Sequence, residues 1–316
     1  MNKILKRLIT TALFVVMFTM AFKSTTPVQA ATPTVTITYN ANGGVYNTGS
    51  KSAKQTVVKD ANVILLPPSV ERSGYIFLGY AQNNRASYPG YLLCNKYKFS
   101  NNITLYAVWV KRTEIYDRYG DSFSYGLNMS QLESTLDLFA YSAWIGKSQS
   151  VKESRMRQLA SKIAGMYGVA VVPQIKKGIP VSRLAKGVDP ANVMGLYAED
   201  VKTIYLNPIL YDDDVYEFSS PTEKEVLPSC HKAARTIAHE MRHAYQHQRA
   251  RNPHGKTDYL YAYNLGYYNY GHNYIDPKSG GLNYNEYQDQ LVEAEAFGVE
   301  KQLQQNLKIL LNPFFK

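Results

Sequence analysis

The sequence of 316 residues predicts two domains of different class, a small β-rich domain followed by a larger α+β domain. Three observations support this prediction. The chain is longer than a typical single domain. Residues 34–110 contain short β-branched and aromatic runs that alternate in polarity, which is typical of strands. Beyond residue 130, longer segments repeat apolar residues at spacings of three and four, which is typical of helices.

Residues 1–30 have the features of a cleaved signal peptide. Lys3, Lys6 and Arg7 form a positive start, an apolar core covers residues 8–22, and Val-Gln-Ala at 28–30 suits cleavage. The apolar core is shorter than a membrane span requires, and no later apolar run is long enough. We therefore expect a secreted protein, extracellular or held at the cell surface, with no membrane span after signal removal.

Net charge and cysteine content limit which partners and which cysteine bonds can be expected. The signal peptide carries four basic residues and no acidic ones, so the net charge of +10 falls to about +6 on cleavage. A moderately basic secreted protein favours anionic surfaces such as bacterial cell-wall polymers. No arrangement of basic and aromatic residues indicates nucleic acid. The two cysteines, Cys94 and Cys230, are expected to be unpaired, partly buried thiols.

The first domain is expected to consist of short strands. Five runs fit this pattern, at residues 34–39, 56–58, 63–66, 74–80 and 103–109. A glycine-containing turn follows the first run, and a pair of prolines ends the third.

Three sequence blocks in this region carry a resemblance to a known family. They are YNANGG at 39–44, RSGYIFLGY at 72–80 and LYAVW at 105–109. In this order they resemble the internalin-type B repeat, also called the Listeria–Bacteroides repeat, with Tyr80 where the family usually has tryptophan. The resemblance implies that residues 31–111 form a β-grasp-like module, used for spacing or adhesion rather than chemistry.

The second domain is expected to begin with helices at 131–144 and 151–166, followed by a strand at 169–175. Two further strands at 194–198 and 203–207 would form a hairpin. This hairpin is our candidate for a sheet edge that could pair with an extended substrate backbone.

Residues 239–243 read H-E-x-x-H inside a stretch of helical character. Pro228 stands just before this stretch, where a helix tolerates proline. On a helix, His239 and His243 lie one above the other and can converge on one zinc ion. Glu240 would then face the zinc-bound water, whose pKa falls to about 7, and could accept its proton.

A catalytic zinc ion usually takes a third protein ligand. On a straight helix, His247 lies about 12 Å from His239, too far for both to bind one ion. Nothing local favours His254 or His272. Carboxylates on a later helical stretch, residues 290–310, are better candidates because a buried carboxylate is costly unless paired or bound to metal.

That later stretch contains Glu293 and Glu295, of which only one can face the ion. An H-E-x-x-H helix followed by a glutamate helix is the pattern of gluzincin zinc peptidases. The form Gln290-x-x-Glu293-x-x-Ala296 resembles the glutamate helix of small bacterial domains of this type. The resemblance implies a zincin-like metallopeptidase domain over residues 112–316, with Glu293 as third ligand and Glu295 as the alternative. It assigns no residues that orient the histidines.

The segment between the two ligand-bearing helices is rich in tyrosine. A hydroxyl from Tyr274, Tyr284 or Tyr287 could stabilise an oxyanion beside the metal. The alternative is that these rings only pack a glycine-rich loop.

These features predict a secreted zinc metallopeptidase that cleaves peptide or protein substrates. Zn²⁺ would be held by His239, His243 and Glu293, with Glu240 as general base. Two alternatives stay open, a surface-binding or adhesive protein with an inactive zincin-like domain and a zinc hydrolase of cell-wall peptides. The intact Glu240 between intact ligands favours an enzyme.

Overall fold

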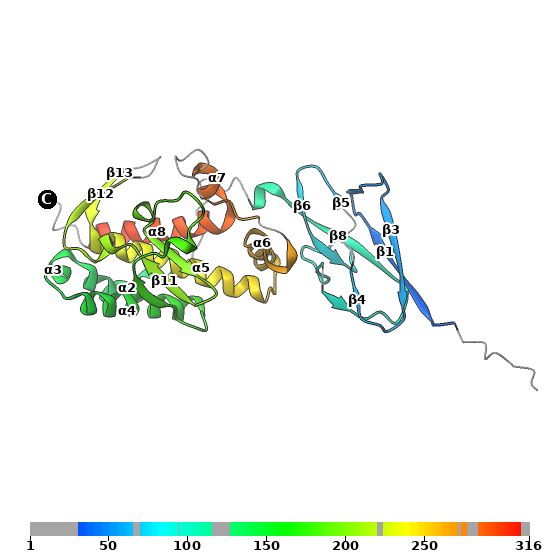
Figure 1. Ribbon diagram of the computed structural model, residues 1–316, viewed down its shortest axis with the longest axis horizontal. Helices are drawn as coiled ribbons and strands as arrows, with labels where there is room; N and C mark the ends of the chain where they lie inside the picture. Colours follow the sequence, from blue (N-terminus) through cyan, green and yellow to red (C-terminus); the bar gives the residue numbers. More distant parts are fainter. Residues whose placement is uncertain are drawn as a thin grey trace, which may run out of the picture.

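The computed structural model describes most of the chain, namely residues 31–65, 70–93, 95–115, 127–219, 224–270, 273–276 and 284–310. A β-rich N-terminal part is followed by a C-terminal part made mainly of helices (Figure 1). The expected signal peptide, Cys94 and His272 lie outside the described residues. Within the described ranges, no helix is both long and apolar enough to cross a membrane.

The N-terminal part is built on a four-stranded sheet in the order β3-β1-β8-β6. Its strands are β1 (Thr34–Asn40), β3 (Ser52–Val58), β6 (Tyr75–Ala81) and β8 (Ile103–Lys111). The first and last of these, β1 and β8, run parallel to each other, and the other neighbours are antiparallel. Two short pairs complete this part, β2 (Val45–Tyr46) with β5 (Val70–Glu71) and β4 (Val63–Ile64) with β7 (Lys96–Tyr97).

Strands therefore form within all five runs that the sequence predicts. A β-bulge interrupts β6 between Phe77 and Gly79. Gly79 has φ +136°, and a Cβ atom there would lie 2.7 Å from the carbonyl oxygen of Tyr91, so a larger residue does not fit. The bulge turns Tyr80 to the same face as Phe77, where the two rings lie 5.0 Å apart.

The two faces of this sheet contribute to two different cores. The inner face packs within the N-terminal part, through residues such as Ile37, Leu105 and Tyr80. The outer face presents Ile76 and Leu78, which join a core shared with the C-terminal part.

The C-terminal part places long helices against a three-stranded sheet in the order β10-β11-β9. The strands are β9 (Gln174–Lys177), β10 (Gly195–Ala198) and β11 (Thr203–Leu206). β10 pairs antiparallel with β11 and forms one edge of the sheet. The predicted hairpin is thus present, with its first strand at the edge.

The long helices are α4 (Gln149–Tyr167), α5 (Ser229–Arg251) and α8 (Leu291–Leu310). α5 lies at the centre and contacts α4, α6, α8 and β10. The remaining elements are α2 (Met129–Leu136), α3 (Tyr141–Trp144), α6 (Lys256–Asn264), α7 (Tyr284–Asp289), β12 (Val215–Ser219) and β13 (Lys224–Pro228). Short 3-10 turns are η1 (Arg112–Glu114), η2 (Asp137–Phe139), η3 (Val181–Arg183), η4 (Pro190–Asn192), η5 (Pro208–Tyr211) and η6 (Tyr267–Asn269).

Two expected elements differ from the structure. The helix expected at 131–144 is broken, because Ala140 takes an extended conformation with ψ 140° between η2 and α3. The strand expected at 169–175 begins only at Gln174. The valines before it do not enter the sheet, Val171 is 55% exposed, and Pro173 lacks the N–H that a sheet requires.

Candidate metal centre

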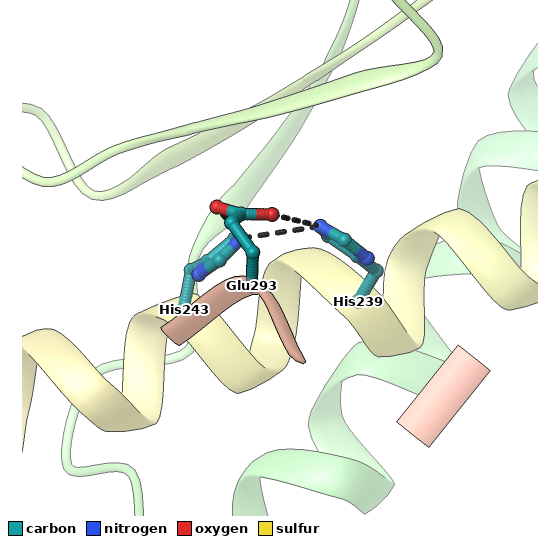
Figure 2. Close-up of side chains that lie close together, drawn as sticks. All are labelled: His239, His243 and Glu293. Carbon is teal, nitrogen blue, oxygen red and sulfur yellow. Dashed lines mark hydrogen bonds and ion pairs between the residues drawn. The ribbon is translucent and has the colours of Figure 1, made fainter. Parts of the chain in front are cut away.

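The two motif histidines lie side by side on α5, with their Nε2 atoms 3.1 Å apart (Figure 2). The helix forms because its buried face is lined by small and aliphatic residues, among them Ala234, Ile237 and Met241. This stripe packs into the main core of the C-terminal part. The histidines are therefore held on a rigid, packed helix, with His239 itself buried.

Glu293 comes from the first turn of α8, which packs along α5. Its carboxylate oxygens lie 3.4 Å from His239 Nε2 and 3.2 Å from His243 Nε2. The three side chains each offer one ligand atom, and these atoms lie within 4.8 Å of one another. Among the described residues, no other group of histidine, cysteine and acidic side chains converges in this way.

The chemistry of this cluster suits a divalent cation. Glu293 is fully buried, and its Oε2 atom has no hydrogen-bond donor among the described residues. Burial lowers the pKa of His239, but Glu293 and Glu300 outweigh it and raise the pKa to about 10. The site thus favours positive charge. A divalent cation such as zinc would supply that charge, and His239, His243 and Glu293 would hold it.

Gln246 orients His243. Its Oε1 atom lies 2.9 Å from His243 Nδ1, which leaves Nε2 for the metal when Nδ1 carries the proton. The amide nitrogen of Gln246 donates to the carbonyl oxygen of Val292 and to Glu295 Oε2, at 2.9 and 3.1 Å. Gln246 is completely buried, and both its amide oxygen and its amide nitrogen have hydrogen-bond partners, as buried polar groups require.

Glu300 is a charged neighbour of the other imidazole rather than a hydrogen-bond partner, because His239 Nδ1 has no hydrogen-bond partner among the described residues. Its Oε2 atom lies 3.5 Å from His239 Nδ1, and its Oε1 atom lies 2.6 Å from Lys232 Nζ and 3.2 Å from an Arg235 guanidinium nitrogen. Burial opposes ionisation of Glu300, but Lys232, His239 and Arg235 together lower its pKa well below the ordinary value. Neither Gln246 nor Glu300 is assigned to the histidines by the sequence motif. Glu300 lies two turns after Glu293, a spacing that returns a side chain to the same helix face.

Glu295, the alternative ligand, faces away from the histidines. It accepts from Arg242 at 2.9 Å and from the hydroxyl of Tyr261 at 2.7 Å. The Arg242 guanidinium also lies over the rings of Tyr167 and Tyr245, 5.3 and 4.8 Å from their centroids. Glu295 therefore belongs to a buried polar network that includes Gln246.

Glu240 contacts the edge strand β10. Its Oε2 atom accepts a hydrogen bond of 2.8 Å from the backbone N–H of Tyr197. Gly195 makes this approach possible, because a Cβ atom there would lie 2.7 Å from Glu240 Oε1 and 2.5 Å from Thr236 Cγ2. Burial raises the pKa of Glu240, and the nearby histidines, His239 and His243, oppose the rise. A carboxylate whose pKa is raised holds an accepted proton more firmly, which suits a general base.

Two of the three predicted tyrosines reach the site. The Tyr274 hydroxyl donates to Glu293 Oε1 at 2.6 Å, and the Tyr274 and Tyr287 rings lie 6.2 Å apart. Burial and the Glu293 charge raise the pKa of both hydroxyls well above the ordinary value, so each stays protonated. The side chain of Tyr284 lies outside the described part of the structure.

The rejected histidines lie elsewhere. His247 Nδ1 lies 3.0 Å from the Tyr267 hydroxyl, and His254 is exposed beside Asn252.

Comparison with known proteins identifies only the N-terminal part. Residues 36–108 match the family model of the Listeria-Bacteroides repeat domain, which confirms that resemblance. No curated protein and no solved structure matches the chain.

Proposed function

We propose that this protein is a secreted, zinc-dependent metallopeptidase whose C-terminal part is a zincin-like domain. The observation that carries the proposal is the convergence of His239, His243 and Glu293, within 4.8 Å of one another, beside Glu240. Three protein ligands with a neighbouring carboxylate are the usual components of a catalytic, rather than a structural, zinc site.

The chain's own residues would divide the work as follows. A bound zinc ion supplies Lewis acidity toward a carbonyl group and a water molecule. Glu240 takes a proton from the attacking water onto its carboxylate and delivers it to the departing amine nitrogen. Tyr274, whose hydroxyl donates to Glu293 Oε1 in this structure, would turn that hydrogen toward an oxyanion formed beside the site.

The edge strand supports a peptide as the substrate. Among the described strands, β10 pairs only with β11 and so has one unpaired side. The N–H of Tyr197 points away from β11 and donates to Glu240, so the outer edge of β10 runs past the general base, and a peptide would pair with the other backbone groups of this edge. An extended peptide added to this edge would bring a backbone carbonyl close to the metal centre.

The N-terminal features support the same setting. The expected signal peptide directs export, and a Listeria-Bacteroides repeat domain is often related to surfaces. The same match favours a second candidate, a surface-binding protein in which the zincin-like domain is inactive. Cell-wall peptides and proteins both remain substrate candidates for the first function.

The metal content of the purified mature chain tests the proposal. We expect close to one zinc ion per chain by elemental mass spectrometry, and its loss in His239→Ala. His254→Ala, which changes an exposed histidine, is the matched control and should keep the metal. A folded protein that binds no zinc would overturn the enzyme proposal and favour the surface-binding candidate.

A further inference from the structure

The repeat domain shares a hydrophobic core with the C-terminal part. Ile76, Leu78 and Val110 from the outer sheet face pack with residues of α6 and of the start of α8. In Figure 1, α6 lies between the sheet and the body of the C-terminal part. The Tyr88 and Tyr259 rings also stack across this contact, 5.9 Å apart. A spacer that only tethers a neighbouring domain does not need such a core.

Ile115, which follows β8 and η1 directly after the repeat domain, contacts the start of the helix that carries Glu293. The backbone N–H of Leu291, the first residue of α8, donates to the carbonyl oxygen of Ile115 at 2.6 Å. The first N–H groups of a helix have no partner inside that helix, so Ile115 supplies one. Both Ile115 and Leu291 are fully buried in the shared core.

A second contact connects the repeat domain to the segment that contains Tyr274. The Tyr270 hydroxyl donates to the carbonyl oxygen of Leu78 on β6. From Tyr270 the chain continues to Tyr274, whose hydroxyl meets Glu293. Gln290 then ties this segment to α8, because its amide bonds both the N–H and the carbonyl oxygen of Ile275, at 3.0 and 2.8 Å.

We propose that the repeat domain, together with the turn at residues 112–115 that follows its last strand, is a structural component of the metal centre, which holds Glu293 and Tyr274 in place by fixing the start of α8 and the segment before it. Lys256 on α6 adds an ion pair to Glu114, directly after β8. The part of this proposal that concerns metal binding rests on the proposed function, whereas the docking of the two parts does not.

Leu78→Asp in the mature chain tests this proposal. Leu78 belongs to the shared core rather than to the inner core of the repeat domain, so a charge there opposes docking more than folding of the repeat. Val58→Asp is the control, since it adds the same charge on β3 at a position that is 44% exposed. We expect Leu78→Asp to bind zinc at least about tenfold more weakly in competition with a chelator, the scale of losing an outer support of a metal ligand. Val58→Asp should bind as the wild type does.

The identity of the metal ligands can be tested separately by loading the protein with Co²⁺. The visible absorption of the Co²⁺-loaded protein depends on the ligands and their geometry. We expect the spectrum of Leu78→Asp to shift toward that of Glu293→Gln, in which the carboxylate ligand is removed. A wild-type spectrum together with wild-type zinc affinity in Leu78→Asp would overturn the proposal.

Two variants that introduce no charge into the shared core control for misfolding. Proline is accepted at the first position of a helix but lacks the N–H that Leu291 donates to Ile115. We expect Leu291→Pro to weaken zinc binding more than Leu291→Ala, which removes more of the side chain but keeps that N–H. Equal affinities in the two variants would contradict the role of this hydrogen bond.

Thermal unfolding separates this inference from the enzyme proposal. We expect one transition for the wild type and for Val58→Asp, and two for Leu78→Asp. If the wild type binds no metal, the proposed function fails, and a single transition still supports docking. Two separate transitions in the wild type would overturn the docking itself.

Discussion

The carboxylate of Glu240 accepts a hydrogen bond of 2.8 Å from the backbone N–H of Tyr197, which joins α5 to the edge of the sheet. A backbone donor on a paired strand moves less than a side chain on a loop. Glu240 is only 5% exposed, so its position depends on this donor and on the space left by Gly195.

Gly195→Ala should therefore lower turnover by about tenfold or more, because displacing a catalytic group by about 1 Å can cost about a hundredfold in rate. Zinc content should not change, since the new methyl group meets Glu240 and Thr236 rather than a ligand. Gly165→Ala is the matched control, because it adds the same methyl group to α4 where the space is open. Alanine also has a higher helix propensity than glycine, so this variant should not lose stability. Steady-state kinetics and zinc analysis of both variants test this prediction. Equal turnover in the two would show that the close approach is unimportant.

Glu240→Gln removes the proposed proton acceptor without removing a ligand. We expect zinc content to stay at the wild-type level and peptide hydrolysis to fall by about 10²–10⁴-fold, the usual contribution of a general base. Glu133→Gln, at an exposed position of α2, provides the control. Hydrolysis by Glu240→Gln at the wild-type rate would refute the assigned role.

Gln246→Leu tests the orientation of His243. The variant keeps the side-chain size but leaves His243 Nδ1 without its acceptor, and Glu295 loses a donor. Loss of such an outer partner typically weakens metal binding by about 10–100-fold. Gln248→Leu is the control, because Gln248 lies two residues later and bonds Gly168 and Ala170 instead. Zinc titration of both proteins should separate them, and identical affinities would count against the role of Gln246.

His231 should make the fold sensitive to acid. Burial, with a contribution from Arg235, lowers the pKa of His231 to about 4, and its Nε2 atom has no hydrogen-bond partner among the described residues. The unfolded chain binds this proton near pH 6.5, so stability is fully present above that pH and declines as the pH falls toward 4. The loss amounts to about 3 kcal/mol at most.

His231→Phe should reduce this decline, as measured by urea unfolding at pH 7 and pH 4.5. His254→Phe, at an exposed histidine, should leave it unchanged. If both variants lose stability as steeply as the wild type, His231 does not cause the sensitivity.

Local patterns predicted much of what forms the site. The helix from Ser229 to Arg251 and the hairpin around β10 are present because their apolar spacing is a property of neighbouring residues. The structure also brings Glu293 next to His239 and His243, as the resemblance implied.

The supporting contacts depend on how the helices pack and could not be predicted in this way. Gln246 and Glu300 gain their roles only because α5 and α8 lie side by side. Arg242 would be an ordinary exposed cation on an isolated helix, and here it is buried against Glu295. Docking of the repeat domain involves residues far apart in the sequence, for which neither spacing nor motif gives a signal.

Ile76 and Leu78 on β6 and Val110 on β8 give the sheet an apolar outer face, and this limits how the repeat domain can be transplanted. Moved to another protein, the module would expose Ile76, Leu78 and Val110 together, and contiguous apolar patches promote self-association. A protein engineer would need polar replacements at these three positions before using it as a fusion partner. Genetic recombination that shuffled this module alone would face the same barrier, so the two parts of this chain are expected to be inherited as one unit.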